Sequence, residues 1–320
     1  SNDLTAKIDR NRWKVMGKYW SAEAVAKDVS TSQYGTIVSL VESPVQEELL
    51  YAGTDDGLIQ ITENGGETWT RISDFPGVPD HTYVSDILAS RYDANVVYAT
   101  FNNHKRDDFK PYILKSTDKG QSWDIIVNGL PENGSVHTIV QDHKKKNLLF
   151  AGTEFSAYFS LNGGKKWHQL NKGLPTIAVM DMAIQQREND LVISTFGRGF
   201  YIIDDYSPLR NINEELLKKD AHLFNVPNAL QYVKTRGRSN QGSTYYYAEN
   251  PEYGAAFTYY LSDVPQTKQQ QRRKKEKKRF KNGERIPQPS WRELEKEELE
   301  EQAHLIFTIK NTQGEVVRRI

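Results

Sequence analysis

The 320-residue sequence contains no cysteine, only three methionines and no apolar run long enough to cross a bilayer. The absence of cysteine excludes disulfides and thiolate metal sites, but it leaves the cellular compartment open. The chain also lacks net charge, because 42 lysines and arginines balance 42 aspartates and glutamates. This balance gives no reason to expect a nucleic-acid partner or a membrane surface for the chain as a whole.

The first residues lack the basic and then apolar pattern of a secretory signal. Two alternatives therefore remain: a cytoplasmic protein, or a mature or internal segment whose signal lies elsewhere. Aromatic residues are plentiful, with 17 tyrosines and six tryptophans, and their side chains suit the pleated surface of a sheet. The composition favours β structure in a chain long enough for two domains.

The strongest signal is an eight-residue motif that occurs at 62–69, 116–123 and 160–167. The copies read TENGGETW, STDKGQSW and SLNGGKKW, and share the pattern Ser/Thr-x-Asp/Asn-x-Gly-x-x-Trp. In such a motif the Asp or Asn side chain bonds turn amides, glycine supplies a positive φ, and tryptophan packs beneath the hairpin. We predict structural roles for Asn64, Trp69, Asp118, Trp123, Asn162 and Trp167.

Two short apolar strands precede each motif, and the whole unit repeats about every 45 residues, a spacing typical of a four-stranded propeller blade. The first strands begin at Thr36, Val84, Val136 and Val179, and the second strands cover 49–54, 96–100, 148–153 and 191–195. The sequence predicts an all-β fold with three full blades and a fourth ending at Asp205, all within residues 36–210. Residues 1–35 are expected to be an N-terminal segment or the end of a preceding blade.

These stretches resemble the Asp-box (BNR-repeat) β-propellers, and more narrowly the sortilin/VPS10-like bacterial proteins that carry a glycosyl hydrolase label. The resemblance covers about residues 36–210 and includes YAGTDDGLIQITENGGETW and RENDLVISTFGRGFYIIDDYSPLR. It implies a secreted, periplasmic or cell-surface location, and a propeller with more blades than four. We therefore expect the chain to be a C-terminal-half fragment, with further blades before Ser1 or on another chain. The cysteine-rich module of animal sortilins has no counterpart here.

Residues 211–320 change in character, and we expect a linker followed by a partial β-sandwich, which the resemblance implies. Residues 213–219 predict a helical turn and 222–227 an extended linker. Residues 255–261 and 305–310 alternate like strands, and the second continues through a turn at 311–314 into 315–319.

The insert at 266–303 separates its charges, with a basic run from Lys268 to Lys281 and an acidic run from Arg292 to Gln302. Ser290 and Glu293 form a capping-box pattern at the start of the acidic run. We predict an antiparallel helical hairpin and no nucleic-acid site, because the basic run has an acidic partner and no interleaved aromatic residues.

Function in a propeller usually lies on the face built by the loops between second and third strands and by the blade connections. A glycosidase needs two carboxylates about 5–10 Å apart, and the candidates on this face are Asp55, Asp56, Asp107, Asp108 and Glu154. The simpler interpretation is that these aspartates only shape their loops. The candidate ligand-binding residues are His81, Tyr83, Asn103, His104, Arg106 and Arg198. We predict no metal site and no cofactor.

Three hypotheses follow. The first is an exported binding module whose propeller face holds a glycan, a peptide or a partner protein. The second is a glycoside hydrolase acting on a polysaccharide, and the third is a structural subunit of an envelope assembly. A channel rich in aromatic residues and poor in carboxylates would favour binding, whereas an open carboxylate pair would favour hydrolysis.

Overall fold

The computed structural model describes residues 3–14, 16–24, 34–229, 231, 233, 253–301 and 304–320. The chain divides into two compact units, residues 1–212 and 213–320. The boundary predicted from the sequence lies after residue 210. Within the described residues, no helix is long and apolar enough to span a membrane.

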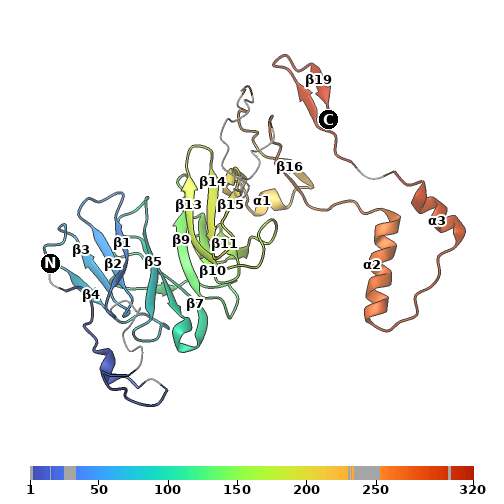
Figure 1. The fold of residues 1–320 in the computed structure, drawn as a ribbon. Coiled ribbons are helices and arrows are strands. Elements are labelled where there is room, and N and C mark those ends of the chain that lie inside the picture. Colours follow the sequence, from blue (N-terminus) through green and yellow to red (C-terminus); the bar gives the residue numbers. More distant parts are fainter. Residues whose placement is uncertain are drawn as a thin grey trace. The chain divides into compact units, whose positions relative to one another are not determined.

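Within its described residues, the first unit has four antiparallel sheets in which strands adjacent in sequence pair with one another (Figure 1). The first sheet has β1 (Ile37–Glu42), β2 (Leu50–Thr54), β3 (Ile59–Thr62) and β4 (Thr70–Ile72). The second has β5 (Tyr83–Ala89), β6 (Val97–Asn103), β7 (Asp108–Ser116) and β8 (Asp124–Ile125). The third has β9 (Val136–Gln141), β10 (Leu149–Thr153), β11 (Ala157–Ser160) and β12 (His168–Gln169). The fourth has β13 (Val179–Gln185), β14 (Asp190–Thr195) and β15 (Phe200–Ile203).

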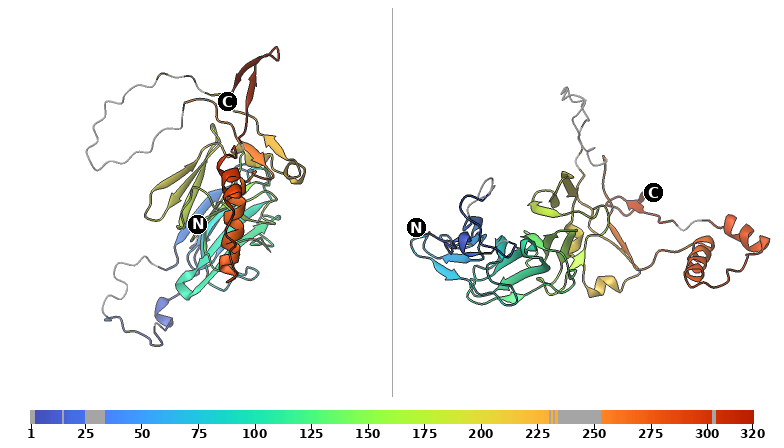
Figure 2. Two further views of the ribbon diagram at one scale, coloured as in Figure 1. Left: turned by 90° about the vertical axis from the view of Figure 1, so that its right-hand side faces the viewer. Right: turned by 60° about the horizontal axis from the view of Figure 1, so that its bottom comes forward.

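The first strand of each sheet packs beside the first strand of the next, so that β1 contacts β5, β5 contacts β9 and β9 contacts β13. Figure 2 shows the sheets in the same succession from two further sides. Up-and-down four-stranded sheets that meet along their first strands are the blades of a β-propeller. The predicted all-β blade fold, with three full blades and a three-stranded fourth, is confirmed.

Neighbouring blades share an apolar core between their facing sheets. At two of these interfaces a strand lies so close to the neighbouring blade that only a glycine fits. A Cβ added at Gly53 on β2 would lie 2.6 Å from Val84 Cγ1 on β5. A Cβ at Gly152 on β10 would lie 2.6 Å from Val179 Cγ1 on β13. Both valines are fully buried. Two of the three interfaces therefore fit a valine from one blade against a glycine of the blade before it, and the register places Thr100 at the equivalent position of the second blade.

The repeated eight-residue motif forms the turn between the third and outer strands of the first three blades. In the second blade, Ser122 N donates to Asp118 Oδ1 at 2.9 Å and Gly120 N donates to Ser116 Oγ at 2.7 Å. The indole N–H of Trp123 donates to the Gly120 carbonyl at 3.0 Å, whereas Trp167 Nε1 reaches the Ile126 carbonyl of the preceding blade. The motif thus closes its own hairpin and places a tryptophan against the preceding blade.

The chain leaves the fourth blade through a short 3₁₀ helix, η3 (Ser207–Arg210), which is anchored to the third blade. Asp142 at the end of β9 accepts from Tyr206 Oη at 2.6 Å and from Arg210 Nη2 at 2.7 Å. Burial would raise the pKa of Asp142, but the Arg210 and Tyr206 hydrogen bonds outweigh it and hold the pKa below its usual value. The carboxylate therefore stays charged, and its hydrogen bonds hold η3 against the sheet of the third blade.

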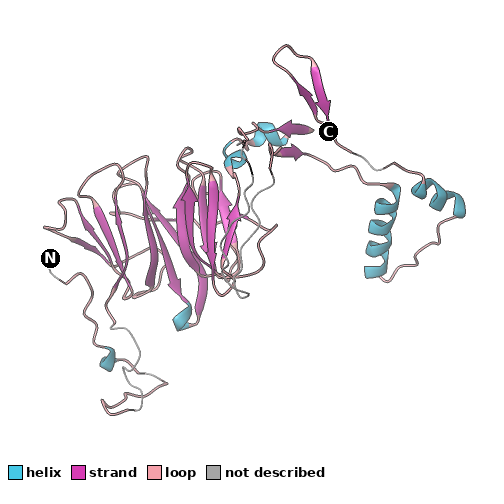
Figure 3. Ribbon diagram, turned by 45° about the horizontal axis from the view of Figure 1, so that its top comes forward, coloured by secondary structure: helices cyan, strands magenta, loops and turns pink. Residues whose placement is uncertain are grey.

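The described residues of the second unit form three helices and two two-stranded sheets, and Figure 3 shows them by type. Its elements are α1 (Glu214–Leu217), β16 (Ala221–Leu223), β17 (Tyr259–Leu261), α2 (Lys268–Lys281), α3 (Trp291–Glu298), β18 (Thr308–Lys310) and β19 (Val316–Arg319). The hairpin predicted after residue 305 is β18 paired with β19. The linker predicted at 222–227 is wrong at its start, because His222 and Leu223 belong to β16, which pairs with β17. The rings of Phe257 and Phe307 stack at 5.3 Å.

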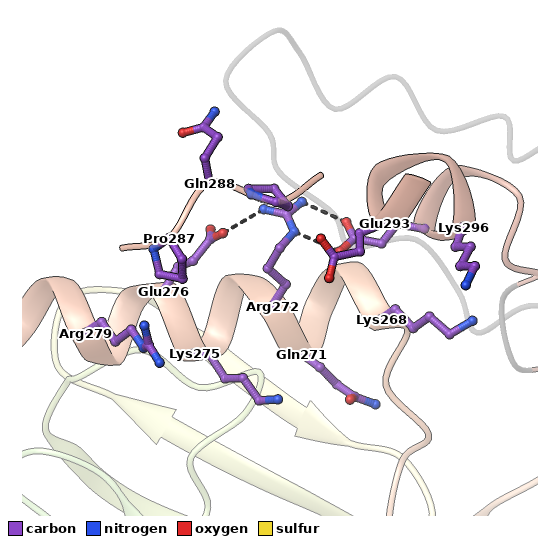
Figure 4. Close-up of a pocket in the computed structure, with 12 residues that line it drawn as sticks. Lys268, Gln271, Arg272, Lys275, Glu276, Arg279, Pro287, Gln288, Glu293 and Lys296 are labelled. Carbon is purple, nitrogen blue, oxygen red and sulfur yellow. Dashed lines mark hydrogen bonds and ion pairs between the residues drawn. The ribbon is translucent and has the colours of Figure 1, made fainter. Parts of the chain in front are cut away.

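The charged insert forms two helices that meet in antiparallel fashion, as predicted. Arg272 in the first turns of α2 donates through Nε and Nη2 to both Glu297 oxygens near the end of α3, each at 2.8 Å. Glu276 accepts a further bond from Arg272 Nη1 at 2.9 Å (Figure 4). The predicted capping box of Ser290 and Glu293 opens α3. A bidentate Arg–carboxylate pair fixes direction as well as distance, so it sets the pairing of the two helices.

An acidic residue sits among the first strands where the blades converge. Asp86 Oδ2 on β5 accepts from Ile139 N and Thr138 Oγ1 on β9, each at 3.0 Å. Burial raises the pKa of Asp86 to about 6, with a contribution from the Asp181 carboxylate, although these two hydrogen bonds oppose the rise. The ionised form is therefore less favourable in the folded chain than in the unfolded chain.

We predict that Asp86→Asn raises the melting temperature above pH 6 and has little effect near pH 4. Because the folded pKa lies above the ordinary aspartate value of 3.8, the wild type loses stability as pH rises from about 4 to about 6 and stays at the lower value beyond. The variant keeps the acceptor oxygen and removes the charge. The gain should be about 1–3 kcal/mol, since one pKa unit is worth about 1.4 kcal/mol. Thermal denaturation across pH checks this, with the exposed Asp74→Asn as control; an equal effect at all pH values would contradict it.

Candidate functional site

A pocket of about 450 Å³ opens on the face built by the loops between second and third strands. Its walls come from the N-terminal segment, from the β2–β3 and β6–β7 loops, and from the starts of β5, β9 and β13. The lining residues are Trp13, Tyr34, Asp55, His81, Tyr83, Asn102, Asn103, His104, Lys105, Arg106, His137 and Met180. Consecutive blades thus supply the loops that surround it.

Aromatic rings form much of the apolar part of this pocket. The rings of Trp13 and Tyr34 meet edge to face at 5.3 Å, and the His81 ring lies 6.0 Å from Trp13. Tyr83 stands at the start of β5. Trp13 is 39% exposed, so one part of a large indole is open to solvent beside the cavity.

Two cations lie over these rings. The Arg106 guanidinium is 5.4 Å from the Trp13 ring centre, and Lys105 Nζ is 5.9 Å from that of Tyr83. Arg106 Nη1 also donates to the Asp80 carbonyl at 2.7 Å, which fixes the guanidinium in place. Cation–π contact and this backbone bond together hold the positive charge against the aromatic wall.

Two phenols add polar groups. Burial raises the pKa of Tyr34, with the Arg106 charge opposing the rise, and burial together with the Asp55 charge raises the pKa of Tyr83. Both phenols are therefore protonated at neutral pH. The Tyr34 hydroxyl is buried, and the Arg106 guanidinium is the charged group beside it.

A chain of polar side chains also borders the pocket. Asn102 Oδ1 lies 2.6 Å from His104 Nδ1, and Asn102 Nδ2 lies 3.4 Å from His137 Nδ1. His137 Nε2 in turn lies 2.9 Å from Glu154 Oε2. This relay orients amide and imidazole groups toward the cavity without a close cluster of metal ligands, and the described residues contain no such cluster.

Two of the carboxylates predicted as catalytic, Asp55 and Asp56, accept hydrogen bonds from backbone amides. Asp55 Oδ1 accepts from Gly35 N at 3.0 Å and from Thr36 N at 2.7 Å. Asp56 is fully buried, and its Oδ2 accepts from Ala6 N at 2.7 Å. Of the five candidates, Asp55 is the one that lines the pocket. Their catalytic role stays a prediction, and the geometry describes anchors of loops.

The long β6–β7 loop is anchored by Asp108. Its Oδ2 accepts from Tyr112 Oη at 2.6 Å and from Asn103 Nδ2 at 3.1 Å. Burial alone would raise the pKa of Asp108, but these two bonds hold it below its usual value. Asp107 precedes it with a left-handed φ of 62°, at the end of the 3₁₀ helix η2 (His104–Arg106).

Five of the six predicted ligand-binding residues meet in this pocket: His81, Tyr83, Asn103, His104 and Arg106. Arg198 does not line it and is exposed in the β14–β15 loop. Sequence reasoning missed Trp13 and Tyr34, because the segment before residue 36 carries no repeat. It also missed Met180 at the start of β13.

A scan against protein-family models finds no match, and a search of curated proteins finds no significant relative. Among solved structures, an ancestral GH74 enzyme is similar with 18% identity and a TM-score of 0.44, over 56% of this chain and 25% of that one. The structure of YCF48 bound to D1 peptide is similar with 16% sequence identity and a TM-score of 0.41, over 53% of this chain and 52% of that one. The extracellular domain of the putative one-component system BT4673 from B. thetaiotaomicron is similar with 14% sequence identity and a TM-score of 0.42. The match covers 57% of this chain and 22% of that one. The chain thus spans between 22% and 52% of the length of these structures.

We predict that Asp108→Asn lowers the free energy of unfolding by about 1–2 kcal/mol at neutral pH, because the amide replaces an anion that accepts two hydrogen bonds. The wild-type contribution is present above the ordinary aspartate pKa and is lost as pH falls through the lowered folded value. Denaturant unfolding at neutral and acidic pH measures both effects.

The neighbouring Asp107→Asn is the matched control. Asparagine tolerates the left-handed backbone at this position, so stability should stay within about 0.5 kcal/mol of the wild type. Equal losses in the two variants would contradict the anchoring role of Asp108.

Proposed function

We propose that this chain is a binding module whose pocket takes an acidic glycan. The observation that supports this most directly is the composition of the pocket, in which Trp13, Tyr34 and Tyr83 stand beside Lys105 and Arg106. The faces of sugar rings are apolar and pack against aromatic side chains, whereas their hydroxyl groups need hydrogen-bond partners.

The charge of the pocket favours a carboxylate-bearing sugar. Arg106 and Lys105 lie on the aromatic wall, and the one carboxylate of the lining, Asp55, accepts two backbone amides through one oxygen. A guanidinium held by the Asp80 carbonyl keeps further N–H groups for a carboxylate, the partner with which Arg pairs best. The Tyr34 hydroxyl offers another donor.

Hydrolysis receives less support from this geometry. A glycosidase acid keeps its proton near neutral pH through a raised pKa. Asp108 has a lowered pKa, and Asp55 and Asp56 hold backbone amides. The proposed location outside the cytoplasm rests on the resemblance to exported Asp-box proteins.

Isothermal titration with oligogalacturonate and with a neutral oligosaccharide of equal length tests the proposal. We expect the acidic oligosaccharide to bind more tightly, with an affinity that falls as salt rises. Trp13→Ala should lower the affinity about tenfold or more, because it removes the largest ring of the wall. Arg106→Gln should remove the preference for the acidic ligand.

Trp291→Ala is the matched control, because that tryptophan is 87% exposed on α3 and does not line the pocket. The result that would overturn the proposal is absence of binding, or binding that Trp13→Ala leaves unchanged. Release of shorter oligosaccharides during long incubation would instead support the glycoside hydrolase hypothesis.

A further inference from the structure

The polar side chains that border the pocket form one line of hydrogen bonds, and the direction of each bond can be assigned. The backbone N–H of His104 lies 3.0 Å from Asn102 Oδ1, so this oxygen is the acceptor and the orientation of the amide is fixed. His104 Nδ1 lies 2.6 Å from the same oxygen and therefore carries a hydrogen. In the neutral imidazole of His104, the other ring nitrogen, Nε2, then holds a lone pair.

The rest of the line is assigned in the same way. The Asn102 amide nitrogen is a donor, so His137 Nδ1, which lies 3.4 Å from it, accepts. The ring hydrogen of His137 is then on Nε2, which donates to Glu154 Oε2 at 2.9 Å. Glu154 thus holds His137, His137 holds the amide of Asn102, and the amide fixes which nitrogen of His104 is free.

The free nitrogen belongs to a residue of the pocket. His104 lines the pocket, and no described residue forms a hydrogen bond with its Nε2. An oriented imidazole with a free lone pair can accept a proton as well as a hydrogen bond. His104 also begins η2, so the two cations of the pocket, Lys105 and Arg106, follow it directly in the chain.

An acidic glycan offers a reaction that uses these groups. In a uronate residue that is linked through its C4 oxygen, the C5 atom bears both the carboxylate and a hydrogen. A cation beside the carboxylate makes this hydrogen more acidic, because it stabilises the negative charge that develops as the proton leaves. Arg106, which donates to the Asp80 carbonyl, and Lys105 are the cations available for this role.

Tyr83 supplies a proton donor in the same pocket. Lys105 Nζ lies 5.9 Å from the centre of the Tyr83 ring, so a positive charge stands near the phenol. Burial together with the Asp55 charge raises the pKa of Tyr83, and the phenol therefore keeps its proton at neutral pH. A protonated phenol can donate to an oxygen that leaves carbon.

We propose that the pocket cleaves an acidic glycan by β-elimination, with His104 as the base and Tyr83 as the acid. This inference rests on the proposed binding of an acidic glycan. His104 Nε2 takes the C5 proton, the electron pair of that bond forms a double bond between C4 and C5, and the bond from C4 to its oxygen breaks. Tyr83 Oη gives its proton to the leaving oxygen. A proton then returns from His104 to Tyr83 through solvent, so the reaction consumes no water, oxidant or reductant.

This chemistry needs no catalytic carboxylate. It therefore agrees with the bonds of Asp55 and Asp56 to backbone amides. It also gives a role to Glu154, which does not line the pocket but ends the line of hydrogen bonds. Asn102, His137 and Glu154 are positioning residues, because they act through the ring of His104.

Incubation with oligogalacturonate, an alginate oligosaccharide and hyaluronan tests the activity, since the uronates of these glycans differ in configuration at C4 and C5. Shorter products alone also fit hydrolysis, so products are identified by the ultraviolet absorbance of the new double bond and by mass. Elimination gives fragments whose masses sum to that of the substrate, whereas hydrolysis adds one water. We expect unsaturated fragments from at least one glycan. Saturated fragments alone, or no cleavage of any of the three, would overturn the inference.

Isothermal titration with the same three glycans separates this inference from the proposed function. Binding without unsaturated product would overturn the elimination and leave the binding module in place. Absence of binding to all three would overturn both.

Replacing the base and the acid tests their roles one at a time. His104→Gln should lower the rate of unsaturated product about a hundredfold or more, while the affinity for the glycan stays within about tenfold. Tyr83→Phe keeps the ring and should have the same two effects. His168→Gln is the matched control, because His168 is exposed on β12 and does not line the pocket. A wild-type rate in His104→Gln would contradict the assignment of the base.

Asn102→Asp tests the line of hydrogen bonds. A carboxylate beside Nδ1 favours the protonated imidazole, so His104 Nε2 becomes free only in more alkaline solution. We expect the rise of the rate with pH to move upward by about one unit or more. A loss of rate with an unchanged pH profile would overturn the positioning role of Asn102, because a general disturbance of the loop lowers the rate at every pH.

Discussion

The structure depends on one constraint: a blade buries an apolar sheet face only when another blade lies against it. The fit is close, because a valine of one blade occupies the space that a side chain would need at Gly53 or Gly152. The buried tryptophans of the second and third motifs meet the blade before them in the same interfaces. Stability is therefore expected to arise mainly between nearest neighbours, as in other repeat architectures.

The same stacking produces the candidate site. Placing first strands side by side brings the β2–β3 loop, the β6–β7 loop and the starts of β9 and β13 to one face, where their polar residues surround a single pocket. Loops carry the ligand groups and sheets fix their spacing. Asp55, Asp56 and Asp108 then hold backbone and loop in place, which leaves aromatic rings and cations to face the cavity.

Much of the first unit could be predicted from the sequence, because the repeated motif and the strands before it report local turn chemistry and alternation. Five predicted ligand-binding residues gathered in the pocket for the same reason, since loop order fixes the face on which they lie. Trp13 and Tyr34 could not be predicted, because contacts far apart in sequence bring them to the pocket. The strand β16 was expected as a linker, since residues 221–223 become a strand only by pairing with β17.

Amide hydrogen exchange is the measurement that tests the stacking constraint most directly. The account predicts slowest exchange in β6 and β10, whose blades are covered on both faces, and faster exchange in β2 and β14, whose blades have one blade neighbour each. Protection in β2 and β14 equal to that in β6 and β10 would contradict the account, because each blade would then be stable without a second neighbour.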